Sequence, residues 1–169
     1  MTRPKMMSSK MKMLLTFAIA ISLFGVGVRN ASAQFVEKKT VSLVTAKKMA
    51  AAAEAEATKN NWNMVISVLD DGGNLLYLER MDGTQLGSIE VSQGKARTAL
   101  QFKRPSKAFQ DLIDKDQQHL ITLGHITGVQ GGLPIMAEGK VVGSIGVSGG
   151  TSAQDEQCAQ AGLNALGAQ

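Results

Sequence analysis

The sequence is poor in cysteine and in aromatic residues. Its 169 residues include one cysteine, one tryptophan and one tyrosine, and aromatic residues make up 4% of the chain. The single cysteine, Cys158, excludes a disulfide within the chain. The scarcity of aromatic residues argues against a binding surface built on large aromatic anchors. Neither a disulfide framework nor an aromatic-rich interface is therefore expected.

Several motifs that carry chemistry are also absent. There is no G-x-S-x-G or H-E-x-x-H motif, which leaves hydrolase and zinc-protease functions without support. A P-loop needs Ser or Thr after Gly-Lys, but Val141 follows Gly139 and Lys140. The glycines at 143, 146 and 149 do not have the spacing of a dinucleotide fingerprint. A nucleotide-phosphate loop is therefore not expected.

The N-terminus has the layout of a secretory signal peptide. A basic lead precedes the apolar run MLLTFAIAISLFGVGV at 13–28, and the small-residue sequence ASA follows at 31–33. The apolar run is short for a membrane span of about 20 residues. We therefore expect cleavage after Ala33, a mature domain at 34–169 without membrane attachment, and a periplasmic or secreted location.

The charge of the chain is concentrated in this leader. Residues 1–33 hold five of the 18 Lys and Arg residues and none of the 14 Asp and Glu residues, so residues 34–169 carry a net charge of −1. A domain without net basic charge lacks the electrostatic footprint of a nucleic-acid-binding protein. Nucleic acid is therefore not an expected partner.

The remaining sequence alternates between helical and strand patterns. Hairpins that alternate with helices predict a single α+β domain with an antiparallel sheet covered by helices. The segment 115–130 has no clear period and is expected to be mostly loop. The expected elements are helices at 44–60, 88–104 and 151–166, a short helix at 105–114, and hairpins at 62–83 and 133–148.

The second hairpin contains an unusual number of glycines. In the strand 141–148, the face of Val142, Ser144, Gly146 and Ser148 is small and partly polar. Glycine within a strand often marks the close approach of a ligand or of another backbone. A helix of the same chain packed tightly on this face is an equal alternative. The sequence leaves the two open.

The blocks VLDDGGNLLYLERMDGTQLGSIEVSQGKARTAL, RPSKAF, GGLPI and GKVVGSIGVSGGTSAQDEQCAQAG carry a resemblance to a known family. They resemble the GlcG/HbpS-like family of haem-binding-protein-like domains, which is also similar to the C-terminal part of PduO-type cobalamin adenosyltransferases. The resemblance covers about residues 41–167. It implies a five-stranded antiparallel sheet flanked by helices, assembly into homo-oligomers, and binding of haem or a related small molecule for sensing or scavenging.

Candidate haem contacts follow from this resemblance and from residue chemistry. Histidine is the usual axial donor, and the only histidines are His119 and His125, which are also the candidate metal ligands. Without a C-x-x-C-H motif, covalent haem attachment is excluded. Two surface histidines without a ligand role are the alternative. The other candidate contacts are Arg80, Arg97, Gly131, Gly132, Ser148 and Gly149, with Lys95 and Arg104 as further cations for the propionates.

Two other functions stay open. An accessory enzyme acting on a small hydroxy-acid or aldehyde would need Asp82, Lys95 and Asp155 as catalytic groups, converging with Arg80 and Ser148 on the glycine-rich strand. Turn and capping roles explain Asp82 and Asp155 more simply. An interaction module would use the small strand face to pair subunits. Cys158 lies on a helical apolar stripe, which predicts a buried thiol.

Overall fold

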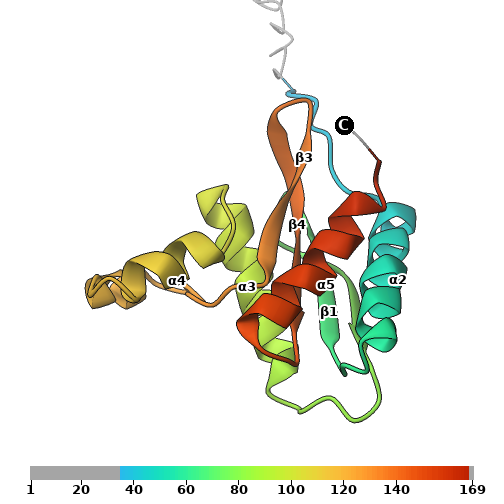
Figure 1. Ribbon diagram of the computed structural model, residues 1–169. Helices are drawn as coiled ribbons and strands as arrows, with labels where there is room; N and C mark the ends of the chain where they lie inside the picture. The colour runs from blue at the N-terminus through green and yellow to red at the C-terminus, as the bar shows by residue number, and fades with distance from the viewer. Residues whose placement is uncertain (1–34, 168–169) are drawn as a thin grey trace, which may run out of the picture. The chain divides into compact units, whose positions relative to one another are not determined.

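The protein is described here by a computed structural model that places residues 35–167, and within them residues 37–167 belong to one compact unit. The predicted signal peptide, residues 1–33, lies outside the described residues. Figure 1 shows the elements of the compact unit. They are the helices α2 (Leu43–Lys59), α3 (Ser88–Phe102), α4 (Lys107–Ile113) and α5 (Ser152–Asn164), the 3₁₀ helix η1 (Gln118–Thr122), and the strands β1 (Val65–Asp70), β2 (Leu75–Arg80), β3 (Gly132–Ala137) and β4 (Lys140–Ser148).

The four strands form an antiparallel sheet in the order β2-β1-β4-β3. Both predicted hairpins are present, and β4 joins them by pairing with β1 from Val65↔Ser148 to Asp70↔Gly143. The predicted α+β class is confirmed. Within residues 35–167, however, the sheet has four strands and not the five that the resemblance implies. Beyond the end of β1, the segment that precedes α2 lies beside β4. It forms one backbone hydrogen bond there, from the Val41 amide to the Val142 carbonyl (3.2 Å), but it does not form a strand.

Local side chains explain where the first elements begin and turn. Helix α2 is capped by Ser42, whose Oγ accepts a hydrogen bond from the Thr45 amide at 3.1 Å. In the β1–β2 turn, Asp70 Oδ1 accepts hydrogen bonds from the amides of Gly72 (2.9 Å) and Asn74 (2.8 Å). Gly73 takes a positive φ of 82° there, which a glycine adopts without strain.

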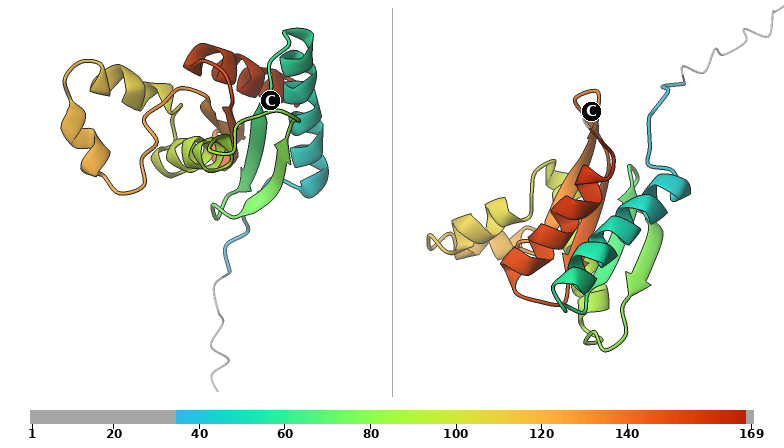
Figure 2. Two further views of the ribbon diagram at one scale, coloured as in Figure 1. Left: turned by 90° about the horizontal axis from the view of Figure 1, so that it is seen from below. Right: turned by 45° about the vertical axis from the view of Figure 1, so that its right-hand side comes forward.

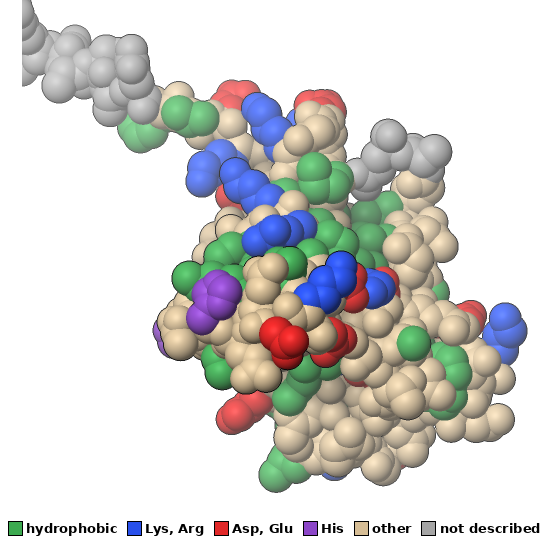
Figure 3. Space-filling model, turned by 60° about the vertical axis from the view of Figure 1, so that its left-hand side comes forward, with side chains coloured by type: hydrophobic (Ala, Val, Ile, Leu, Met, Phe, Trp, Pro, Cys, Tyr) green, Lys and Arg blue, Asp and Glu red, His purple; other side chains and the backbone are tan. Residues whose placement is uncertain are grey.

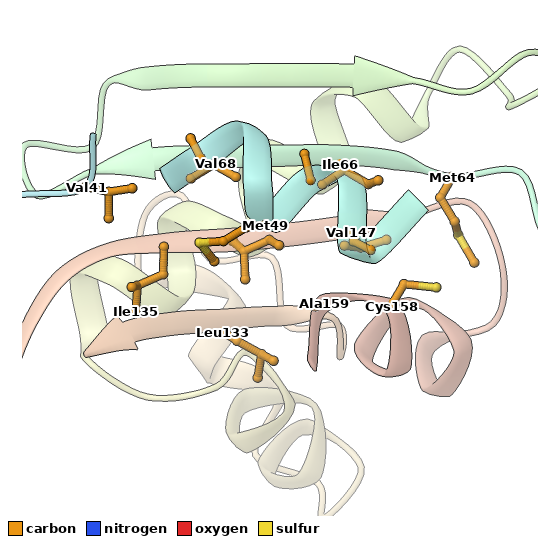
Figure 4. Close-up of a cluster of buried hydrophobic side chains, with 14 of the residues drawn as sticks. Val41, Met49, Met64, Ile66, Val68, Leu133, Ile135, Val147, Cys158 and Ala159 are labelled. Atoms are coloured by element: carbon orange, nitrogen blue, oxygen red, sulfur yellow. The ribbon is translucent and has the colours of Figure 1, made fainter. Parts of the chain in front are cut away.

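One face of the sheet carries the hydrophobic core. Helices α2 and α5 lie side by side on this face (Figures 1 and 2). Figure 4 shows Ile66, Val68 and Val147 of the strands pointing toward Met49 of α2 and Cys158 of α5. Four alanines of α2 (46, 50, 53 and 57) are fully buried, and their small side chains allow the helix to pack close to its neighbours. The predicted burial of Cys158 is confirmed.

The other face of the sheet is small and polar, and α3 covers it. Ser67 and Ser92 share a buried hydrogen bond of 2.7 Å between sheet and helix. A Cβ placed on Gly146 would lie 2.1 Å from the carbonyl oxygen of Ser92 and 2.9 Å from the Ala96 Cβ. Gly146 is therefore required by a helix of the same chain. Of the two alternatives for the glycine-rich strand, the structure therefore favours a helix of the same chain packed on its small face.

An arm projects away from the sheet between α3 and β3 (Figure 1). It consists of α4, η1 and the irregular residues 123–130. The Thr127 amide donates to Thr98 Oγ1 of α3 at 2.8 Å, and Ser106 Oγ donates to the Val129 carbonyl at 2.7 Å. These bonds fix the base of the arm to the rest of the domain. None of the helices within 35–167 combines the length and the apolar character needed to cross a bilayer.

Candidate functional site

The most buried pair of charged side chains links the two faces of the sheet. Lys95 comes from α3 on one face, and Asp155 comes from the first turn of α5 on the other. Lys95 Nζ lies 2.5 Å from Asp155 Oδ2 and donates to the Val147 carbonyl at 3.1 Å. Asp155 Oδ1 accepts from the Gly150 amide at 2.9 Å. The pair therefore acts as an internal clamp between helices that do not share a face.

Two glycines make room for this clamp at the start of β3. Gly131 has a φ of 120°, and a Cβ there would lie 2.8 Å from the Asp155 Cβ and 2.9 Å from the Val147 carbonyl oxygen. A Cβ on Gly132 would lie 2.2 Å from the Lys95 carbonyl oxygen. Both glycines of the GGLPI block are therefore required, because Lys95 and its partners lie too close to the start of β3 to leave room for a side chain.

Burial controls the protonation chemistry of the clamp. Desolvation lowers the pKa of Lys95, and it raises the pKa of Asp155, although each partner's charge opposes the shift of the other. The exposed fractions of the two side chains are 1% and 3%, so a substrate in solution cannot reach either group. The clamp therefore has a structural role, because a buried ion pair with satisfied hydrogen bonds fixes one arrangement of the helices.

The other members of the predicted catalytic constellation lie elsewhere. Arg80 and Ser148 flank Val65 on opposite neighbouring strands, so one strand separates them. Arg80 Nε donates to the Thr84 carbonyl at 3.1 Å, and Ser148 Oγ donates to Ser88 Oγ at 3.3 Å. Asp82 is exposed in the loop after β2. Of the five predicted groups, the structure brings together only Lys95 and Asp155.

Both histidines lie on the arm. His119 is in η1 and His125 follows it with a φ of 68°, and both are exposed. The apolar side chains of Ile121 and Leu123 lie between them in sequence and are 65% and 45% exposed. Figure 3 shows histidine side chains at the surface, with hydrophobic side chains close by. Soluble proteins seldom expose several large apolar side chains together without a function for them.

The remaining predicted contacts do not join the histidines. Arg97 is exposed on α3 and borders a hollow whose lining includes neither histidine. A Cβ on Gly149 would lie 2.1 Å from the Asn63 carbonyl oxygen, so this glycine also has a packing role. The guanidinium carbon of Arg104 lies 4.3 Å from the Phe109 ring centroid. Sequence reasoning missed Lys103, which lines the same hollow as Arg97. The sequence offered no signal for it, because Lys103 lies inside the helix predicted at 88–104.

No protein-only metal centre is formed by the described part of the chain. Within it, no group of three or more His, Cys, Asp or Glu side chains is placed to hold a metal ion. His119 and His125 are therefore left as candidate donors to a metal that brings its own ligands, such as the iron of a porphyrin.

Comparison with known proteins places this fold in a family. The family model described as "Haem degrading protein HbpS-like" matches residues 41–164. Protein GlcG of Escherichia coli strain K12 is 40% identical over 111 residues, which cover 66% of this chain and 83% of GlcG.

Solved structures are similar as well. A double mutant of HbpS from Streptomyces reticuli is 29% identical, with a TM-score of 0.76 over 84% of this chain and 97% of that one. The crystal structure of a PduOC:haem complex is 25% identical, with a TM-score of 0.70 over 76% of this chain and 96% of that one.

Proposed function

The chain belongs to the HbpS-like family, and on that premise we propose that it binds haem non-covalently through the arm. Haem iron accepts an imidazole nitrogen, and the porphyrin needs apolar contact. The observation that carries the proposal is that both histidines lie on one arm, beside exposed Ile121 and Leu123. The haem in the PduOC complex and the family description support the same ligand.

The arm offers an open half-site, because its histidines and apolar side chains are exposed. A flat macrocycle bound on an open surface keeps one face in water, so a large part of its apolar area is not buried and does not contribute to binding. We therefore propose that a second copy of the chain covers the other face of the haem. Homo-oligomer formation and haem binding are then coupled, because the second copy supplies the other half of the haem site and the bound haem adds contact between the two copies.

We further propose that residues 1–33 are removed during export and that the mature protein acts in the periplasm or outside the cell. The basic lead, the apolar run at 13–28 and the ASA sequence at 31–33 support this proposal. In that compartment, we propose that the protein senses or scavenges haem without turnover. The accessory-enzyme alternative has less support, because Lys95 and Asp155 are sealed in the interior.

A hemin titration of the purified protein tests the haem proposal. We expect a Soret shift at micromolar hemin, and we expect His119→Ala or His125→Ala to change the spectrum and weaken binding about tenfold or more. Gln118→Ala is the matched control, since it truncates an exposed side chain of η1 without removing an imidazole. The proposal is contradicted if hemin gives no Soret shift, or if the spectra of both histidine variants are the same as that of the original protein.

Native mass spectrometry of the same preparation tests the coupled proposals together. The subunit mass reports whether residues 1–33 are present, and the assembly mass reports subunit count and bound haem. We expect haem in assemblies of two or more processed subunits. Haem bound to single subunits would contradict the shared site, and an unprocessed chain recovered from the periplasmic or secreted fraction would contradict cleavage.

A further inference from the structure

A basic hollow lies on the side of the sheet that α3 covers. It has a volume of about 310 Å³ and is formed where the β1–β2 turn, the last turn of α3 and the beginning of β4 meet. Its lining includes Asp71, Gly73, Arg97, Leu100, Lys103 and Val141. The three segments are distant in sequence, so the hollow exists only in the folded chain.

The charges around the hollow favour an anion. Arg97 and Lys103 contribute two cations, and neither forms an ion pair with another described residue. The one carboxylate in the lining, that of Asp71, is 3.7 Å from Lys38 Nζ. The Lys38 ammonium therefore offsets its charge. Among the described residues no carboxylate pairs with Arg97 or Lys103, and the Arg97 guanidinium donates one long hydrogen bond, of 3.4 Å, to Gln93 Oε1.

The geometry also limits what kind of anion fits. The hollow lies at the C-terminal end of α3, where the negative end of the helix dipole opposes any anion and opposes a doubly charged anion more strongly than a singly charged one. Leu100 and Val141 give it an apolar wall, and a Cβ on Gly73 would be only 3.5 Å from Leu100 Cδ2. A singly charged carboxylate with a short apolar body is repelled less by the helix terminus than a phosphate dianion, and unlike phosphate it can also contact the apolar wall.

We propose that this hollow is a binding site for the carboxylate group of a small apolar organic acid, held by Arg97 and Lys103. The guanidinium of Arg97 can form paired hydrogen bonds with a carboxylate, and Lys103 supplies a point charge. The carboxylate can come from a free acid or from a haem propionate, which carries the same group on an apolar frame. The site involves neither histidine, so it does not depend on the haem ligation proposed for the arm.

The test is a titration of the isotope-labelled protein followed by amide chemical shifts. Butyrate is the probe, butyramide is its uncharged counterpart, and inorganic phosphate is the multiply charged competitor. We expect butyrate to shift the amides of Gly72, Gly73 and Gln101 at millimolar concentration and butyramide to leave them unchanged. Absence of shifts with butyrate, equal shifts with butyramide, or tighter binding of phosphate would overturn the proposal.

Variants connect the shifts to the two cations. Arg97→Gln and Lys103→Asn should each weaken butyrate binding about tenfold. Asparagine suits position 103 because Lys103 has a φ of 54°, a conformation that asparagine tolerates. Lys48→Gln is the charge-matched control, since Lys48 is exposed on α2 over the opposite face of the sheet. Unchanged affinity in both hollow variants would overturn the proposal.

Hemin titrations of the same variants distinguish the two sources of the carboxylate. If the group is a haem propionate, Arg97→Gln and Lys103→Asn weaken hemin binding as well as butyrate binding. If the group belongs to a free acid, the variants lose butyrate and keep the hemin affinity of the original protein. Failure of the haem proposal leaves the butyrate result unaffected, so the two proposals can fail separately.

Discussion

At the scale of single residues, the clearest feature is a lysine whose charged end is in the interior. Lys95 is one of the largest fully buried side chains, and its ammonium is matched by the Asp155 carboxylate and the Val147 carbonyl. Burial of a charge is costly unless a partner and hydrogen bonds compensate it. Gly131 and Gly132, which lack side chains, leave the space that this pair and its backbone neighbours occupy.

The pair predicts a specific pattern of stabilities. Lys95→Met should lower the free energy of unfolding by about 3 kcal/mol, because it leaves Asp155 buried without its cation. Lys95→Met combined with Asp155→Asn should recover part of this loss, since no charge then remains unpaired. Denaturant unfolding measures both, with Lys48→Met as the exposed control. A loss below about 0.5 kcal/mol in Lys95→Met would contradict the clamp.

At the scale of elements, the sheet presents two chemically different faces to its helices. The α2 and α5 side is filled by aliphatic and sulfur-containing side chains. The α3 side has Ser67, Ser144 and Gly146, and the helix approaches it closely because these side chains are small. The glycine-rich strand thus reflects the short distance between a helix and a sheet.

A methyl group added at this contact should be poorly tolerated. Gly146→Ala places a Cβ 2.1 Å from the Ser92 carbonyl oxygen, and both atoms belong to elements that cannot move independently. We expect a loss of about 2 kcal/mol or more in the free energy of unfolding. Gly124→Ala is the control, because nothing lies within 4 Å of its Cβ. Equal stability of the two variants would show that α3 moves away freely.

At the scale of the whole compact unit, both faces of the sheet are occupied by its own helices. The two ligand sites that we propose, the arm and the basic hollow, therefore both lie at the periphery of the described residues. The interior is sealed around Cys158, whose side chain is fully buried at the contact of α5 with α2 and the sheet. Desolvation, with smaller contributions from the charges of Glu56 and Asp155, raises the pKa of this thiol to about 12.

The buried thiol should report on global unfolding. At pH 8 a thiol with this pKa is almost entirely protonated and unreactive. We expect the native protein to resist a thiol reagent such as DTNB and to react fully in denaturant, with a labelling rate that follows the fraction unfolded. Cys158 is the only cysteine, so the signal has one source. Rapid labelling of the native protein would contradict the sealed core.

Prediction from sequence succeeded where the signal is local. Alternating residues identified both hairpins and the small face of β4. Helix α2 was predicted at 44–60, one residue later than its bounds in the structure. The family resemblance supplied a fifth strand that the described residues do not form.

By itself, the sequence determined the helix and strand periods, the α+β class, the family and the burial of Cys158, because these depend on neighbours within a few turns or on whole blocks of residues. Only the tertiary structure decided that Gly146 faces α3, that Lys95 meets Asp155, and that Arg97 and Lys103 share a hollow. Lys95 and Asp155 are 60 positions apart. Contacts at such distances are set by how the helices pack on the sheet, and no local pattern encodes that packing.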